Sequence, residues 1–179
     1  QSLDGVINDF LFKKINDFFR TVGWNVVILK YGKRLWKAFE GPAGGALRQW
    51  IDDCPNQLYS ALTFKGGSAW REHLKTDLKG TRGLKELLDG HDDASLHGLM
   101  TNLAGHDMES VLEAYHTVAD DTPQCFVAYT VKGYGLPLAG HKDNHAGLMT
   151  VDQMALFKKT MGIAEGAEWE PFAGLEKDA

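Results

Sequence analysis

Cysteine is scarce in this sequence, and the two that are present lie far apart. The 179 residues include 2 cysteines, Cys54 and Cys125, with no Cys-x-x-Cys motif and no companion histidine at zinc-binding spacing. This pattern favours neither disulfide bonds nor a structural zinc site. It indicates a reducing compartment, and we expect the protein to be cytoplasmic.

The sequence also lacks a long apolar run and an excess of positive charge. Its longest apolar stretches, residues 26–29 and 125–129, fall far short of the ~20 residues that cross a bilayer. Lysine and arginine number 19 against 24 aspartates and glutamates, which gives a net charge of −5. We therefore expect neither a membrane nor a nucleic acid as partner, although a local basic patch can still bind an anion.

The composition that remains is that of a folded α/β domain. The chain is 44% hydrophobic and 11% aromatic, and its length suits one domain with a proper core. Two short, β-rich apolar runs, residues 24–29 and 124–131, are typical of strands buried on both faces in a parallel sheet. Each run follows an amphipathic helical stretch, and this alternation predicts an α/β fold.

Helical periodicity and end signals place the helices around these strands. Asp107 and Ser68 are predicted N-caps, and Thr150 with Gln153 forms a capping box. Gly90 suits the position where a helix ends. The expected helices cover residues 6–22, 33–40, 45–52, 68–74, 84–88, 108–118 and 151–161.

The end of the second strand carries a candidate anion site. Residues 132–135, Lys-Gly-Tyr-Gly, follow the strand directly, and ligands of open α/β sheets bind beyond the carboxyl ends of the strands. Glycines let backbone N–H groups approach an anion closely, and the Lys132 ammonium group supplies positive charge. A phosphate or diphosphate is the natural ligand. The alternative is a glycine turn with a solvated lysine.

A polar loop follows at residues 140–147 and holds two histidines, His141 and His145. A loop of this kind, placed between glycines, can close over a substrate and deliver a general acid. Histidine suits that role because its pKa lies near neutral pH. A metal pair is less favoured, because ligation at this spacing needs a helix that the glycines oppose. A solvated surface loop is the remaining alternative.

Three other groups of residues have a structural interpretation beside a functional one. Residues 105–107, Gly-His-Asp, stand at a predicted helix start, where anions bind but where Asp107 is also a good N-cap. Residues 71–73, Arg-Glu-His, fit an ordinary charged helix face. Cys125 fits the core of a strand better than the role of a nucleophile.

Several short motifs occur in a defined order: residues 1–5 (QSLDG), 23–26 (GWNV), 71–73 (REH), 105–107 (GHD), 132–135 (KGYG) and the loop at 140–149. In this order the sequence resembles the homodimeric pyruvate dehydrogenases, the thiamine-diphosphate-dependent first components of bacterial 2-oxo-acid dehydrogenase complexes and relatives of transketolase. Each motif is weak alone, and their order makes the combination more specific. The resemblance extends from Gln1 to Gly162.

The resemblance implies the thiamine-diphosphate-binding fold, here an incomplete doubly wound parallel sheet with helices on both faces. It implies that residues 1–162 are the C-terminal part of a diphosphate-binding domain and that residues 163–179 are a tail or the start of an interdomain linker. The Gly-Asp-Gly sequence that opens the family's metal motif does not occur in this chain. We therefore expect a longer parent enzyme and no activity in the isolated chain.

The resemblance also implies cofactors and site residues. The cofactors are thiamine diphosphate and Mg²⁺, and Gln1 matches the residue whose backbone carbonyl completes the Mg²⁺ shell. Lys132 matches a lysine near the cofactor. His145 matches the active-site-loop histidine implicated in substrate processing and acetyl transfer, with His141 as the alternative register.

The implied activity is that of a homodimeric pyruvate dehydrogenase. Such an enzyme decarboxylates pyruvate, or a related 2-oxo acid, and passes the acetyl group to a lipoyl-bearing acyltransferase component. A transketolase-like enzyme that moves two-carbon units between sugar phosphates is the alternative within the superfamily. A non-catalytic relative with a role in assembly is the alternative from another class.

Overall fold

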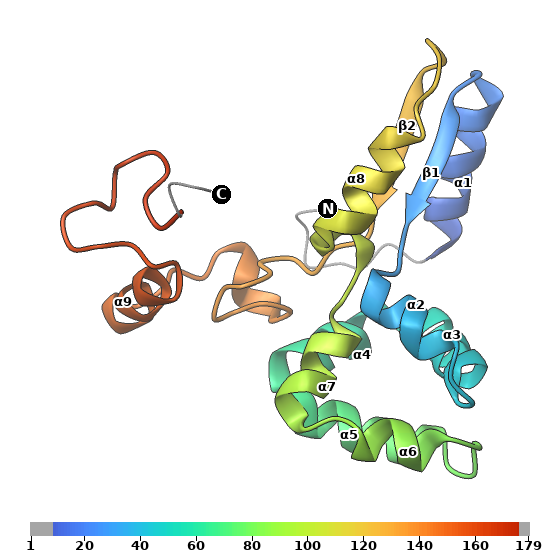
Figure 1. The fold of residues 1–179 in the computed structure, drawn as a ribbon, viewed down its shortest axis with the longest axis horizontal. Coiled ribbons are helices and arrows are strands. Elements are labelled where there is room, and N and C mark those ends of the chain that lie inside the picture. Colours follow the sequence, from blue (N-terminus) through green and yellow to red (C-terminus); the bar gives the residue numbers. More distant parts are fainter. Residues whose placement is uncertain (1–8, 176–179) are drawn as a thin grey trace.

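The structure is a computed structural model, and it describes residues 9–175 (Figure 1). Helices make up most of the described chain, together with two strands and two short 3-10 helices. In chain order these are α1 (Asp9–Thr21), β1 (Asn25–Leu29), α2 (Lys33–Phe39), α3 (Gly44–Asp53), α4 (Asn56–Lys65), α5 (Gly67–Asp77), α6 (Leu84–Asp89), α7 (Asp93–Met100), η1 (Ala104–His106), α8 (Met108–His116), β2 (Gln124–Ala128), η2 (Lys142–His145) and α9 (Val151–Thr160).

The two strands pair in parallel, as the sequence predicts. Their register runs from Asn25 opposite Gln124 to Leu29 opposite Ala128. Helices α1 and α8 both pack against β1, and in Figure 1 α8 lies in front of the strands while α1 lies behind them. The expected α/β class, with a parallel sheet and helices on both faces, is confirmed.

The prediction that both strands are buried on both faces is wrong. In β1 only Val26 is buried, and Ile28 is 44% exposed. The residues of β2 are half-buried or exposed. In the described chain each strand has one hydrogen-bonded neighbour, so one edge and part of each face remain open.

The second strand also ends earlier than the sequence predicts, at Ala128 rather than Val131. The Tyr129 N–H still donates to the Leu29 carbonyl at 2.8 Å. The Val131 N–H instead donates to the side chain of His106 at 2.7 Å. A side chain from another segment therefore satisfies a backbone group that periodicity alone assigns to the strand.

Most of the predicted helices are present, including the capping box in which Thr150 and Gln153 open α9. The predicted cap at Ser68 is wrong, because α5 begins at Gly67 and Gly66 occupies the N-cap position. Gly66, with φ of +87°, ends α4 and precedes α5, so Ser68 lies inside the helix. Periodicity and end signals did not predict α4 and α7. Asp92 nevertheless provides a side-chain cap for α7.

Helices α2 to α7 form a compact helical module, residues 33–100, with its own core. At its centre Trp70 is fully buried and lies edge-on to Trp50 and Tyr59, with ring centroids 6.0 and 5.0 Å away. The Tyr59 hydroxyl donates to the carbonyl of Met100 and so links α4 to the end of α7. Seven further side chains are almost completely buried around this centre: Leu35, Leu47, Leu62, Leu74, Leu88, Leu96 and Met100.

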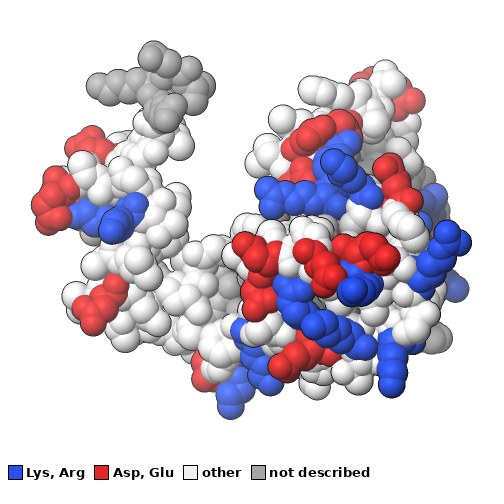
Figure 2. All heavy atoms as spheres, turned by 60° about the horizontal axis from the view of Figure 1, so that its bottom comes forward, with Lys and Arg blue, Asp and Glu red and all other residues white. Residues whose placement is uncertain are grey.

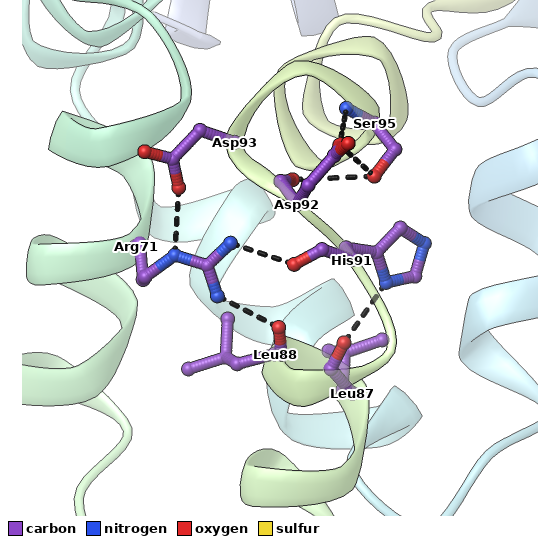
Figure 3. A network of polar contacts seen from close by, with 7 residues as sticks. All are labelled: Arg71, Leu87, Leu88, His91, Asp92, Asp93 and Ser95. Carbon is purple, nitrogen blue, oxygen red and sulfur yellow. Dashed lines mark hydrogen bonds and ion pairs between the residues drawn. The ribbon is translucent and has the colours of Figure 1, made fainter.

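Arg71 connects α5 to the segment between α6 and α7 (Figure 3). Its guanidinium group donates to the carbonyls of Leu88 and His91, each at 2.7 Å, and to the carboxylate of Asp93 at 2.8 Å. The Leu88 carbonyl lies in the last turn of α6 and the His91 carbonyl lies just after the helix, and backbone acceptors in such positions need partners. The Arg-Glu-His motif therefore supplies a clamp for the helical module rather than only a charged helix face.

The chain then leaves the sheet as a C-terminal arm, residues 146–175, that extends away from the helical module (Figure 1). Several apolar side chains of the arm are exposed, among them Leu148 at 91% and Trp169 at 95%. On the face shown in Figure 2, acidic and basic side chains are interspersed, so this face has no continuous area of one charge. No helix within residues 9–175 is both long and apolar enough to cross a membrane.

We predict that Arg71→Ala lowers the free energy of unfolding by about 2–3 kcal/mol, because it leaves two backbone carbonyls without their charged donor. Arg71→Lys should lose most of the same stability, since a single ammonium group cannot replace the guanidinium fork. Arg82 is exposed, and Arg82→Ala should change stability by less than about 0.5 kcal/mol. Urea unfolding of the three variants measures the effect, and equal midpoints for Arg71→Ala and Arg82→Ala contradict the clamp.

Candidate functional site

Residues 102–107 form a connecting segment that contacts the carboxyl ends of both strands. Leu103 pairs with Tyr31 in an isolated antiparallel bridge just after β1. The Ala104 N–H donates to the Lys30 carbonyl at 3.1 Å, and the Gly105 N–H donates to the Tyr129 carbonyl at 3.0 Å. The segment thus hydrogen-bonds to the residues just beyond both strands. This is the end of the sheet where ligands bind in α/β folds.

Asp107 caps two helices at once. One carboxylate oxygen accepts the Ser110 N–H of α8 at 3.3 Å, and the other accepts the Lys33 N–H of α2 at 2.6 Å. Burial by itself raises the pKa of Asp107, but these two backbone donors lower it below the ordinary value. The predicted N-cap is confirmed, and the helix start that offered a possible anion site holds its own carboxylate.

His106, the middle residue of the same motif, contacts the turn after β2. Its Nε2 atom accepts the Val131 N–H, and its ring is stacked on Tyr134 with centroids 3.9 Å apart and an angle of 13° between the planes. Burial lowers the pKa of His106. The motif offered an anion site or an N-cap, and in the structure its histidine contacts the turn that carries Lys132.

The Lys132 side chain is exposed at the start of this turn. Within the described residues no carboxylate forms an ion pair with its ammonium group, in contrast to Lys30, Lys33 and Lys158. The backbone of the turn is held by a Tyr134 N–H to Val131 carbonyl hydrogen bond of 3.1 Å. Lys132 therefore presents an unpaired positive charge on a fixed backbone.

The turn and the histidine loop are joined through Asn144. Its side-chain amide donates to the Lys132 carbonyl at 2.6 Å, and the Gly140 N–H donates to the same carbonyl at 3.3 Å. Gly133 has φ of +71°, and a Cβ atom there would overlap the Asn144 side chain. The structure therefore brings the Lys132 turn and the loop of His145 together, and glycine is needed where they meet.

The two histidines of the loop have different environments. The Nδ1 atom of His141 accepts the Asp143 N–H at 3.2 Å at the start of η2, and its ring lies 4.5 Å from that of Phe64 in α4. His145 ends η2 and is exposed, and its side chain forms no hydrogen bond or ion pair within residues 9–175. His141 is thus committed to the loop's own structure, whereas the side chain of His145 has no such contact within the described residues.

These residues fit an anionic cofactor in part. The unpaired ammonium of Lys132 and the glycine turn suit a diphosphate group. Gln1, the expected Mg²⁺ ligand, lies outside the described residues. Across residues 9–175 there is no group of three side chains able to hold a metal ion.

A separate hollow of about 490 Å³ lies at the end of β1, between α2, α3 and α8. At its wall the Lys30 ammonium and the Tyr31 hydroxyl both donate to the carboxylate of Asp52. Burial raises the pKa of Asp52, but these donors lower it below the ordinary value. These polar groups pair with one another and connect α3 to the residues just after β1. Neither Lys132 nor His145 lines this hollow.

The parallel strands, the helices on both faces and the polar segments beyond the strand ends define an α/β protein. The chain is similar to proteins named pyruvate dehydrogenase E1 component, as the order of its motifs indicates. It is 29% identical to that of Corynebacterium glutamicum over 96% of the chain, 28% identical to that of Cupriavidus necator over 91%, and 27% identical to that of Escherichia coli over 82%.

The chain spans less than a fifth of the length of these relatives, from 19% of the C. glutamicum protein to 16% of the E. coli protein. No family model matches the chain. The similarity confirms the resemblance found in the motifs, and it extends over the connecting segment, the Lys132 turn and the helical module alike.

We predict that Gly133→Ala loosens the histidine loop more than Gly135→Ala does. Both glycines have positive φ, +71° and +80°, so each substitution costs about 1–2 kcal/mol in backbone strain. Only at Gly133 does the added Cβ also overlap Asn144; at Gly135 it meets open space. Hydrogen exchange of residues 140–147 should therefore accelerate in Gly133→Ala and change little in Gly135→Ala. Equal exchange in the two variants refutes the close contact.

Proposed function

We propose that this chain forms part of a thiamine-diphosphate-dependent pyruvate dehydrogenase that decarboxylates pyruvate and reductively acetylates a lipoyl carrier. One observation carries the proposal: the unpaired Lys132 and the unpaired His145 lie on two segments that Asn144 joins at the carboxyl end of β2. The similarity to pyruvate dehydrogenase E1 components over most of the chain supports the choice of reaction.

Lys132 is the residue that we assign to the cofactor. When bound, thiamine diphosphate supplies the carbanion that attacks the keto carbon and the electron sink that follows decarboxylation. The Lys132 ammonium, which has no ion-pair partner among the described residues, neutralises negative charge at the diphosphate end. The backbone carbonyl of Gln1 is proposed as one Mg²⁺ ligand on the strength of the resemblance alone.

His145 is the residue that we assign to acetyl transfer. An exposed imidazole on a polar loop can accept or donate a proton during a reaction and can orient the thiol of a lipoyl group. His141 is less suited to this role, because its Nδ1 accepts the Asp143 N–H and its ring packs near Phe64. The structure therefore supports His145 over the alternative register.

The partners follow from the same proposal. They are pyruvate or a related 2-oxo acid, a lipoyl-bearing acyltransferase component and a second copy of the enzyme. The exposed apolar side chains of the C-terminal arm, such as Leu148 and Trp169, support contact with a further protein surface.

We predict that Lys132→Ala in the complete enzyme weakens thiamine diphosphate binding by about 1–3 kcal/mol, or roughly 5- to 150-fold, the effect of losing a charge-assisted hydrogen bond. Titration calorimetry in the presence of Mg²⁺ measures the affinity. Lys159 lies exposed on α9, and Lys159→Ala is the matched control that should leave the affinity unchanged. If Lys132→Ala binds the cofactor as tightly as the control, Lys132 does not contribute to cofactor binding and is only a solvated residue after β2.

We predict that His145→Ala spares cofactor binding and slows reductive acetylation of the lipoyl carrier by about 10²–10⁴-fold, the usual contribution of a positioned general acid. His141→Ala is the informative comparison, because it removes the acceptor at the start of η2 and the contact with Phe64. It should increase hydrogen exchange throughout residues 141–146 and affect acetyl transfer less.

A rate loss confined to His141→Ala shows that His141, and not His145, corresponds to the active-site-loop histidine of the family. Full acetyl transfer in both variants excludes the loop from catalysis. Two-carbon transfer between sugar phosphates, with no acetylation of a lipoyl carrier by the unaltered enzyme, supports the transketolase-like alternative. Absence of both activities in a folded, cofactor-saturated enzyme supports a role in assembly.

A further inference from the structure

His106 makes a hydrogen bond that is possible in one protonation state only. A backbone N–H can only donate, so the 2.7 Å contact from the Val131 N–H requires an unprotonated Nε2 atom on His106. The imidazole is therefore neutral, with its proton on Nδ1. Protonation of Nε2 places two donors face to face and breaks the contact.

The same imidazole contacts the turn at two points that enclose Lys132. Val131, which precedes the lysine, donates to the Nε2 atom, and Tyr134, which follows it, stacks on the ring with centroids 3.9 Å apart. Val131 is itself buried, at 8% exposure, whereas Lys132 is exposed. One side chain from the connecting segment thus fixes the backbone on both sides of an exposed lysine.

The imidazole is anchored in turn by its own backbone. The Gly105 N–H before it donates to the Tyr129 carbonyl at 3.0 Å, and the Asp107 side chain after it caps α2 and α8. A Cβ atom on Gly105 would lie against Thr130 and the Tyr129 carbonyl, so the segment approaches the end of β2 as closely as a glycine allows. His106 therefore has a rigid base from which to hold the turn.

We propose that His106 is a positioning residue that holds the Lys132 turn in its binding geometry while its imidazole is neutral and releases the turn when the imidazole is protonated. The proposal rests on the proposed function in one respect, the assignment of Lys132 to the cofactor diphosphate. The coupling between His106 and the turn stands on the geometry alone.

The surroundings of His106 set the direction of its pH dependence. Burial disfavours the charged imidazole and lowers the pKa of His106. Two of the nearby charged groups have other partners: Asp107 accepts two backbone N–H groups, and Lys30 pairs with Asp52 and lies over the ring of Tyr129. The third, Lys132, is exposed to solvent.

Since the folded-state pKa of His106 lies below its unfolded value, the unfolded chain binds more protons as the pH falls. The contribution of the Val131 contact is therefore complete above pH ~6.5, the ordinary pKa of histidine, and is lost as the pH falls through the lower folded-state pKa.

The first experiment needs no cofactor and uses the 179-residue chain. We expect ¹⁵N resonances of the imidazole to show the Nδ1-protonated form at pH 7.5. The protection factor of the Val131 amide, measured by hydrogen exchange and corrected for the intrinsic rate at each pH, should fall roughly 10- to 100-fold as His106 titrates, the scale of losing a buried hydrogen-bond acceptor. Protection that stays constant while His106 titrates overturns the proposal.

Two variants separate positioning from a general structural role. His106→Gln places a non-titrating oxygen near the position of Nε2, so it should retain the Val131 protection and abolish its pH dependence. His106→Ala should lose the protection at every pH. His116→Ala, at the exposed end of α8, is the matched control and should keep the unaltered pH profile. Loss of protection in His106→Gln equal to that in His106→Ala also overturns the proposal.

The second experiment tests the functional consequence in the complete enzyme. Thiamine diphosphate affinity should fall in His106→Ala, recover in His106→Gln, and be no weaker in the His106→Ala/Lys132→Ala double variant than in Lys132→Ala alone, because both changes act through one lysine. Additive losses contradict positioning. If Lys132→Ala has no effect while the Val131 result holds, the proposed function fails and the coupling of His106 to the turn survives.

Discussion

The ends of the two strands depend on the backbone hydrogen bonds of residues 102–107. A two-stranded sheet leaves many peptide groups without a partner, and unpaired peptide groups away from water are costly. The connecting segment pairs with Lys30 after β1 and with Tyr129 after β2, so it closes both strands at the same end. Asp107 then starts two helices from one carboxylate.

This closure fixes the backbone at that end. The backbone groups of the corner are satisfied by neighbours, among them His106 for the Val131 N–H and Asn144 for the Lys132 carbonyl. The side chains of Lys132 and His145 make no hydrogen bond or ion pair within residues 9–175. A rigid frame with a few uncommitted polar groups is the arrangement that a ligand or a reacting group requires.

The helical module is a second, largely independent source of stability. Its core surrounds Trp70, and its clamp is Arg71, whose guanidinium donates to the carbonyls of Leu88 and His91 at the end of α6. The module contacts the histidine loop through α4, where the ring of Phe64 lies near that of His141. Packing in the module therefore supports one anchor of the loop, while the end of β2 supports the other.

The local features of the protein could be predicted from its amino-acid sequence. The alternation of helices and β-rich runs, the cap at Asp107 and the capping box at Thr150 depend on residues a few positions apart, and periodicity and capping chemistry reveal such features directly. The order of the short motifs also identified the relatives that comparison confirms.

Which polar side chains hydrogen-bond to the backbone, and which have no such partner, depends on contacts between distant parts of the chain. The contacts of His106 with Val131 and of Arg71 with Leu88 join residues far apart in the chain, and no local pattern specifies them. The same holds for the early end of β2 and for the difference between His141 and His145. Long-range hydrogen bonds settle these points, because a backbone group left open by one segment is satisfied by whichever side chain the fold brings to it.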